Sequence, residues 1–203
     1  MMDVTIAVAT FGDDGWVRTA EEVALPSAES FGVPVVHCHR DTLYGARNAC
    51  LDEVCTEMVI YLDADDELEY GYLAAMVTAS ADIRVPQVRY VRPGQSIPSQ
   101  PVMPKVAGHS HRCRPACLVY GNWIVIGAAA RTDLLREVGG WRDYGWEDWD
   151  LWLRCHLAGA SIQAAPPAVY RAYVRPESRG RYSPEESLAH HRAVAQANGV
   201  PVP

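Results

Sequence analysis

A group of acidic residues follows an apolar stretch of the chain. Residues 58–62 read Met-Val-Ile-Tyr-Leu, and Asp63, Asp65, Asp66 and Glu67 come directly after them. A continuous apolar run is typical of a buried parallel strand, and open α/β sheets bind ligands at the carboxyl ends of such strands. Crowded carboxylates repel one another unless a cation lies among them, and oxygen ligands suit Mg²⁺ or Mn²⁺. The stretch therefore predicts a divalent metal with a phosphorylated substrate; the alternative is a solvated acidic turn.

A second acidic pair, Glu147 and Asp148, opens a predicted helix in which Trp149, Trp152 and Leu153 share one face. The helix macrodipole favours ionised carboxylates at this end. Two interpretations remain open for the pair. It is either an acidic cap on a core helix or a general base held by a rigid helix start.

The composition restricts the class of protein. The chain has 203 residues and a formal net charge of −7, which argues against a general nucleic-acid binder. No apolar run approaches the length of a membrane span. The first residues carry no basic segment, so we expect no signal peptide. The six cysteines are then expected to be free thiols, and the expected location is the cytoplasm.

The elements that must position the acids alternate between strand and helix. Apolar runs predict strands at 4–9, 33–37 and 58–62, and helices are expected from Asp13 or Asp14, over about 42–54 and over 72–78. This alternation is typical of a parallel sheet. The polar strand ends should lie side by side and form a nucleotide site; they are Thr10–Gly12, His39–Asp41 and Asp63–Asp66.

The middle of the chain is less regular. Residues 83–91 alternate as a strand does, and Pro86 suggests an edge position. From 92 to about 117 prolines and glycines dominate, which predicts a long mobile loop. The loop carries four potential zinc ligands, which are either a metal site or a coincidental cluster: His109, His111, Cys113 and Cys117.

The remaining chain predicts three more elements before and after the Glu147 helix. Residues 123–130 are apolar and suggest a strand, and Thr132 should cap a short helix that ends at Gly139 and Gly140. A capped helix is expected over about 183–199.

Taken together and in order, these motifs resemble the inverting GT-A glycosyltransferases of family 2. The strand end Thr10-Phe11 and the triplet Ala46-Arg47-Asn48 match the family's nucleotide side. Leu62-Asp-Ala-Asp-Asp66 is its Asp-x-Asp motif. Gly139-Gly-Trp141 followed by Glu147-Asp-Trp-Asp-Leu-Trp-Leu-Arg154 is similar to its acceptor segment. Each motif is weak alone, but their order and spacing agree over roughly residues 3–180.

The resemblance implies an α/β fold of GT-A type, with a Rossmann-like, mostly parallel central sheet flanked by helices. It also implies a nucleotide-diphosphate sugar donor, most often a UDP-sugar, and Mn²⁺ or Mg²⁺. Asp65 would bind the metal together with Asp63, and Asp66 would support them. The residues implied in binding the nucleotide sugar are Thr10, Phe11, Asp41, Arg47, Asp63, Ala64 and Asp65.

On the acceptor side, the resemblance makes Asp148 the base that deprotonates an acceptor hydroxyl, with Glu147 orienting acceptor or base. Trp141 or Trp146 could stack on a sugar ring. The acceptor itself stays open between a glycan, a protein and a lipid-linked molecule. The implied activity is a metal-dependent, inverting hexosyl transfer.

Two departures from the family pattern stand out. Only His39-Arg-Asp41 is available where relatives grip the base, and a strand-helix unit could be missing between residues 30 and 46. Where relatives have a His-Pro-Gly-Ser-like turn, this chain has Arg175-Pro-Glu-Ser178. An arginine does not bind metal, but it can pair with a diphosphate.

We expect one GT-A domain over residues 1–203, with a nucleotide half at about 1–91 and an acceptor half at about 118–180. Rival hypotheses are a haloacid-dehalogenase-like phosphatase and a binding module without turnover. The phosphatases expect Thr or Val at the position of Glu67. Nucleotidyl transfer would need a glycine-rich N-terminal loop, which Thr10–Gly15 resembles poorly.

Overall fold

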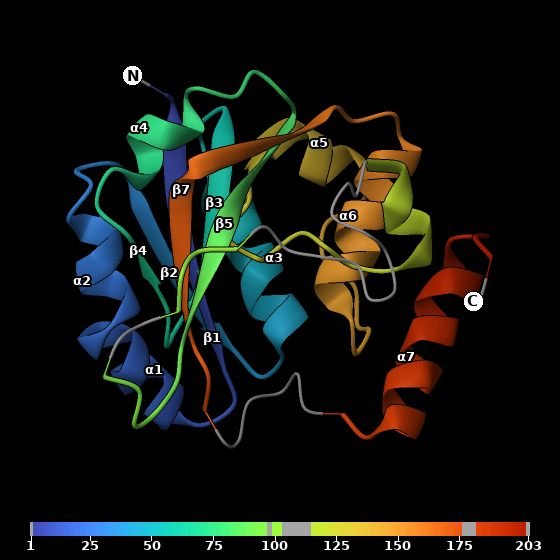
Figure 1. Ribbon diagram of the computed structural model, residues 1–203, viewed down its shortest axis with the longest axis horizontal. Coiled ribbons are helices and arrows are strands. Elements are labelled where there is room, and N and C mark those ends of the chain that lie inside the picture. Colours follow the sequence, from blue (N-terminus) through green and yellow to red (C-terminus); the bar gives the residue numbers. More distant parts are fainter. Residues whose placement is uncertain (1, 97–98, 103–114, 176–181, 202–203) are drawn as a thin grey trace.

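The computed structural model describes residues 2–96, 99–102, 115–175 and 182–201. A central sheet runs through this part of the chain, and helices lie on both of its faces (Figure 1). Its strand order is β2-β1-β3-β6-β5-β7-β4. The strands are β1 (Val4–Phe11), β2 (Val35–Arg40), β3 (Met58–Asp63), β4 (Glu67–Leu68), β5 (Ile83–Val91), β6 (Ala129–Arg131) and β7 (Ile162–Tyr173).

Most strands of the sheet point the same way. β1 is parallel to β2 and β3, and β5 is parallel to β7, whereas β6 and β4 run against their neighbours. The strands β2, β1, β3, β5 and β7 therefore end at one edge. The expected mostly parallel sheet is confirmed, and its carboxyl edge collects the polar residues that follow the strands.

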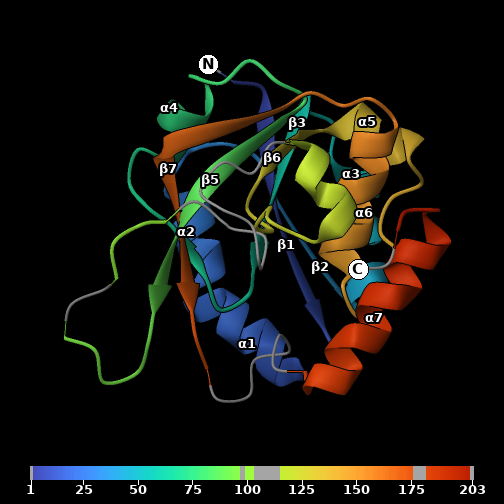
Figure 2. The same ribbon diagram turned by 45° about the vertical axis from the view of Figure 1, so that its right-hand side comes forward.

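The helices form two layers. On the left of Figure 1 lie α1 (Asp14–Glu22), α2 (Ala24–Glu29) and α4 (Tyr72–Met76). On the right of Figure 2 lie α3 (Leu43–Glu53), α5 (Thr132–Glu137) and α6 (Glu147–Leu157), and α7 (Pro184–Ala197) lies outside α6. A 3₁₀ helix, η1 (Pro115–Tyr120), packs against α6. No described helix is long and apolar enough to span a bilayer.

The elements of the N-terminal half form as expected because their signals are local. The Asp13 side chain accepts a hydrogen bond from the Gly15 N–H and caps α1, and Thr42 caps α3 in the same way through Gly45 N. In the sheet, Thr10 pairs with His39, and Ala9 pairs with Asp63. The three polar strand ends therefore lie side by side, as predicted.

Two strand predictions for the middle of the chain were wrong. β5 is not an edge strand, because it lies between β6 and β7. Pro86 is tolerated there since it falls where the β5–β7 register shifts between Val85 and Gln87. The predicted strand at 123–130 shrinks to Ala129–Arg131. Before it, the chain is irregular, and Gly127 lies so close to the Tyr170 ring that a Cβ would come within 2.1 Å of it.

Thr132 does not cap α5, because Arg131 is the cap residue and no side chain makes the capping hydrogen bond. The sequence reasoning also did not predict β7, whose twelve residues include a proline pair. β7 nevertheless pairs with both β5 and β4. Its carboxyl end brings Tyr173 and the following Arg175 to the same edge as Asp63–Asp66.

The turn before α6 is joined to α3 by one side chain. Asn48 donates to the Trp141 carbonyl at 2.9 Å and accepts from the Trp141 N–H at 2.8 Å. The turn passes through Gly139 and Gly140 at φ values of 86° and 66°, and a Cβ on Gly140 would come within 2.5 Å of the Asn48 Oδ1. Asn48 therefore fixes the approach of the chain to α6.

We predict that Asn48→Ala lowers the free energy of unfolding by about 2 kcal/mol, because it leaves a buried backbone donor and acceptor without partners. Urea denaturation at neutral pH measures this. Asp52→Ala, at an exposed position of the same helix, should change stability by less than about 0.5 kcal/mol. Equal effects of the two substitutions would contradict the role given to Asn48.

Candidate active site

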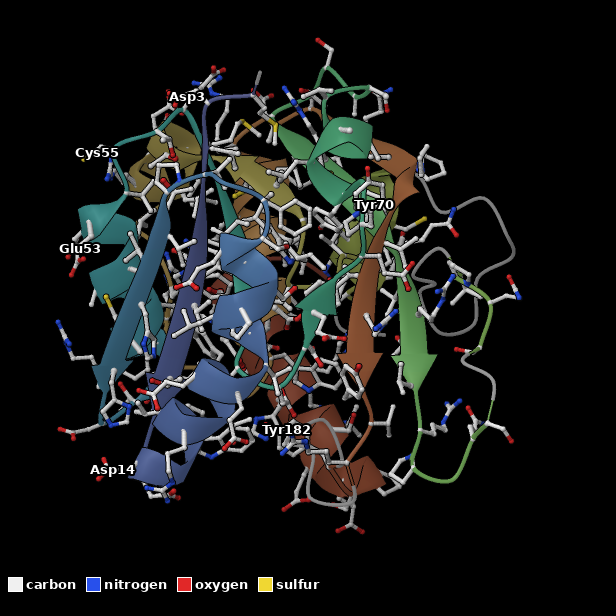
Figure 3. All side chains as sticks on the ribbon, turned by 90° about the vertical axis from the view of Figure 1, so that its left-hand side faces the viewer. Asp3, Asp14, Glu53, Cys55, Tyr70 and Tyr182 are labelled. Atoms are coloured by element: carbon white, nitrogen blue, oxygen red, sulfur yellow. The ribbon has the colours of Figure 1, made fainter. Side chains whose placement is uncertain are left out.

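A cavity of about 710 Å³ opens at the carboxyl edge of the sheet. It is lined by residues from β1, α3, β3, β7 and the start of α6, and by the irregular segment 122–126. In Figure 3, Tyr182, which lines the cavity, lies at the same end as Asp14, whereas Asp3 and Cys55 mark the amino ends of β1 and β3. The acidic residues of the cavity wall are Asp63, Asp65, Asp66, Glu147 and Asp148.

Arg47 is the buried cation at the centre of this wall. Its guanidinium pairs with Asp63 at 2.9 Å and with Glu147 at 3.0 Å, and its side chain is 4% exposed. It also lies 4.4 Å above the Trp141 ring, which makes a cation–π contact. Arg47 therefore joins the two acidic motifs, which lie far apart in the sequence.

Asp66 is committed to holding the strand ends together. Its carboxylate accepts hydrogen bonds from the Tyr170 hydroxyl and from the Tyr173 N–H, both at 2.8 Å. The Tyr170 hydroxyl in turn accepts from the Asp63 N–H at 3.2 Å. Burial and the neighbouring charges of Asp63 and Asp65 raise the pKa of Asp66. Asp66 therefore joins the end of β3 to the end of β7 through these hydrogen bonds.

Asp65 faces the cavity and pairs with Arg175, whose Nε lies 3.1 Å from its Oδ2. Burial and then the charge of Asp63 raise the pKa of Asp65, and Arg175 lowers it. The carboxylate oxygens of Asp63 and Asp65 are the type of ligand that Mn²⁺ and Mg²⁺ prefer. Within the described residues, however, no three His, Cys, Asp or Glu side chains gather closely enough to hold a metal. A cation here would need further oxygens from a bound diphosphate and from water.

Asp148 lies at the first turn of α6 beside Glu147. Its Oδ1 accepts from the Trp149 N–H at 2.8 Å and its Oδ2 from Asn122 Nδ2 at 2.7 Å. Burial, followed by the charge of Glu147, raises the pKa of Asp148 to about 7, although Arg47 opposes the shift. A carboxyl group with this pKa can accept a proton near neutral pH, which an ordinary aspartate does poorly.

Most of the predicted site residues line the cavity: Thr10, Phe11, Arg47, Asp63, Ala64, Asp65, Trp146, Glu147, Asp148 and Arg175. Asp41 does not. It lines a smaller pocket of about 170 Å³ that adjoins the cavity through Phe11, Leu43 and Glu147.

Trp141 corrects another expectation. It is 2% exposed, covered by Arg47 and packed edge-on against Tyr61 at 4.9 Å between ring centroids. The Trp141 ring therefore packs against the Arg47 guanidinium and is not accessible to a sugar. Of the possible zinc ligands, His109, His111 and Cys113 lie outside the described residues.

The sequence reasoning missed Asn122, Tyr170, Tyr173 and Tyr182. Tyr170 and Tyr173 belong to the unpredicted β7, and Asn122 directly precedes the segment wrongly predicted as a strand. No local pattern marks any of them, because each acts through a partner distant in the sequence: Asp66, Asp148 or Gly145.

Comparisons with known proteins agree with this fold. Residues 10–105 match the family model described as glycosyl transferase family 2. Residues 1–349 of TarS from S. aureus, solved with UDP-GlcNAc, are 17% identical with a TM-score of 0.60. The mannosyltransferase PcManGT from Pyrobaculum calidifontis, solved with GDP-Man and Mn²⁺, is 16% identical with a TM-score of 0.59. GalNAc-T7, solved with UDP, GalNAc and Mn²⁺, is 12% identical with a TM-score of 0.59.

The alignments cover 96%, 98% and 97% of this chain and 66%, 66% and 48% of those three. This chain thus spans at most about two thirds of the chains it resembles. No curated protein sequence matches significantly. The fold is of the GT-A type, and the family match favours a glycosyltransferase over the phosphatase alternative. The family model covers residues 10–105, and the resemblance drawn from the motifs of the chain is confirmed.

The raised pKa of Asp148 predicts a pH-dependent cost to stability. The folded state binds this proton more tightly than the unfolded chain, so stability falls as pH rises from about 4 towards about 7. Asp148→Asn should therefore gain stability over the wild type across this interval, by up to about 4 kcal/mol, and the gain should level off above it. Denaturant titrations at pH 4.5, 6 and 8 measure the difference. A difference that is constant with pH would contradict the shift.

Proposed function

We propose that this protein transfers a sugar from a nucleotide-diphosphate sugar to an acceptor hydroxyl, with inversion at the anomeric carbon. One observation carries the proposal. Arg47 pairs with Asp63 and with Glu147, so the carboxylates of the Asp-x-Asp motif and Asp148, whose pKa is about 7, line one cavity. The Asp-x-Asp carboxylates are suited to binding a cation with its diphosphate, and Asp148 is suited to accepting a proton.

On the donor side, we infer that Thr10, Phe11 and the segment from Asp63 to Asp65 bind the nucleotide, and that Arg47 holds Asp63 in place. Asp41, in the adjoining pocket, would reach the nucleotide only from the side. Asp65, with Asp63, would hold Mn²⁺ or Mg²⁺, which would neutralise the charge that develops on the departing nucleoside diphosphate. Arg175 supplies a second cation beside Asp65 for the same diphosphate.

On the acceptor side, Asp148 takes the proton of the acceptor hydroxyl while the oxygen of that hydroxyl attacks the anomeric carbon. A new carbon–oxygen bond forms on one face of the sugar, and the bond to the diphosphate breaks on the opposite face. The electron pair of that bond leaves with the diphosphate, and the configuration inverts. Glu147 pairs with Arg47 and so keeps the helix start aligned.

The proposal divides the chain into a donor half over about 1–91 and an acceptor half over about 118–180. Trp146 lines the cavity beside Glu147 and packs against Tyr182, which suits a sugar-binding platform. A UDP-sugar is the donor to test first, and a GDP-sugar the second, because the similar structures contain UDP-GlcNAc and GDP-Man.

A donor screen tests the reaction. UDP-, GDP- and dTDP-sugars are incubated with Mn²⁺, Mg²⁺ or chelator, and release of nucleoside diphosphate is measured. We expect release from one donor that stops with chelator and in Asp65→Ala. Asp148→Asn should bind that donor as the wild type does and turn it over about 10² to 10⁴ times more slowly. If calorimetry detects no donor binding under any condition, the proposal fails.

Arg175 generates a separate prediction. Arg175→Gln should weaken the binding of the nucleoside diphosphate about 10- to 100-fold, because a charge-assisted contact to phosphate is lost. Arg175→Lys should recover part of this affinity, since it keeps the charge but not the planar fork. Arg131→Gln is the matched control, because it removes an equal charge that pairs with Asp82 and Asp133 away from the cavity. Equal affinities of Arg175→Gln and the control would refute the contact.

A further inference from the structure

The side chain of Asn122 is fixed at both ends. Its Oδ1 accepts a hydrogen bond from the Ile124 N–H at 2.9 Å, and its Nδ2 donates to Asp148 Oδ2 at 2.7 Å. A backbone N–H can only donate, so the amide oxygen must face Ile124. The amide nitrogen is therefore forced towards Asp148, and the orientation of Asn122 follows from hydrogen-bond chemistry.

Asn122 leaves Asp148 able to act. The Trp149 N–H occupies one lone pair of Oδ1, and Asn122 occupies one of Oδ2. Each carboxylate oxygen has two lone pairs, so each keeps one. The two bonds come from different directions in the chain, one from the helix itself and one from the segment that precedes Trp123. Together they restrain rotation of the carboxylate about its side-chain bonds.

The charged groups around Asp148 come from three elements. Glu147 on α6 and Asp63 on β3 disfavour its ionised form, and Arg47 on α3 favours it. Burial acts in the same direction as the two acids. Asn122 is the neutral side chain that donates directly to the carboxylate, and a donor of this kind stabilises the charged state.

We propose that Asn122 is a positioning residue for the general base: it aims the Asp148 carboxylate and stabilises its ionised form by donating a hydrogen bond to it. This inference rests on the proposed function of Asp148 and adds a residue that no motif of the family resemblance contains. Asn122 acts through Asp148, and its loss should therefore change the proton affinity of that carboxyl group, not the binding of the nucleotide.

The sign of the effect follows from the hydrogen bond. Without the donor, the ionised carboxylate loses a partner and the protonated form does not, so the pKa rises. The loss of one charge-assisted hydrogen bond corresponds to an increase of about one pH unit. Asp148 would then be mostly protonated at pH 7, and turnover should recover as the pH is raised.

The test is a titration of the Asp148 carboxyl carbon by NMR in protein labelled with ¹³C at aspartate side chains, with Asp148→Asn identifying the signal. Asn122→Ala removes both contacts of the side chain. Asn122→Asp keeps an oxygen for Ile124 and removes only the donor, so the turn is preserved. We expect the midpoint to rise by about one unit in Asn122→Ala and by more in Asn122→Asp, where two carboxyl groups titrate together.

Asn198→Ala is the matched control. Asn198 donates to Asp150 Oδ1 at 2.9 Å on the same helix, but it does not line the cavity. Its substitution should leave the Asp148 midpoint unchanged. Binding of UDP or GDP, whichever the wild type binds, should be unchanged in Asn122→Ala.

Unchanged midpoints in Asn122→Ala and Asn122→Asp would overturn the inference, as would an equal shift in Asn198→Ala. The proposed function fails in a different experiment, namely when Asp148→Asn turns over donor as fast as the wild type. The titration needs no acceptor and no turnover, so the two failures can be told apart. Where turnover is measurable, the acidic limb of kcat/KM in the variants should move to higher pH by the same interval.

Discussion

The structure of the site depends on the burial of one guanidinium group. Arg47 is almost inaccessible to water, and a buried cation is tolerated only where anions and hydrogen bonds compensate for its lost hydration. Asp63 and Glu147 provide that compensation from the end of β3 and the start of α6. Trp141 fills the space beneath, and Asn48 holds the backbone of Trp141 from the next position of α3. Loss of the ion pairs would leave an uncompensated charge in the core.

Because Arg47 is shared, the acidic residues of the cavity do not behave alike. Asp63 and Glu147 are neutralised in part by the arginine, Asp66 is tied to β7, and Asp65 has Arg175 beside it. Asp148 has no salt bridge in this part of the chain and receives hydrogen bonds from neutral donors. Burial and the charge of Glu147 raise the pKa of this carboxyl group to about 7. Under the proposed function, this carboxyl group serves proton transfer, while Asp63 and Asp65 serve the metal and the diphosphate.

Some of this was readable in the sequence because its physical cause is local. The continuous apolar run before Asp63 favours a buried strand, and the side chains of Asp13, Thr42 and Ser183 cap the helices that follow them. Parallel strands joined by helices must end at one edge, so the polar residues after β1, β2 and β3 had to meet there. The order of the motifs then identified the family, and Arg47, Asp63, Asp65 and Asp148 all reach the cavity.

Only the tertiary structure decided the rest, because the deciding partners are far apart in the chain. The bonds of Arg47 to Glu147 and of Asp66 to Tyr170 each span about 100 residues, and no short pattern encodes such pairs. Pro86 indicated an edge strand, but a shift of register in the sheet accommodates it. The aromatic ring of Trp141 suggested a sugar-stacking residue, but the Arg47 guanidinium covers one face of that ring. Asn122 carried no signal at all. Local sequence determines which elements form and where their polar ends lie, whereas packing determines which side chain each charge meets.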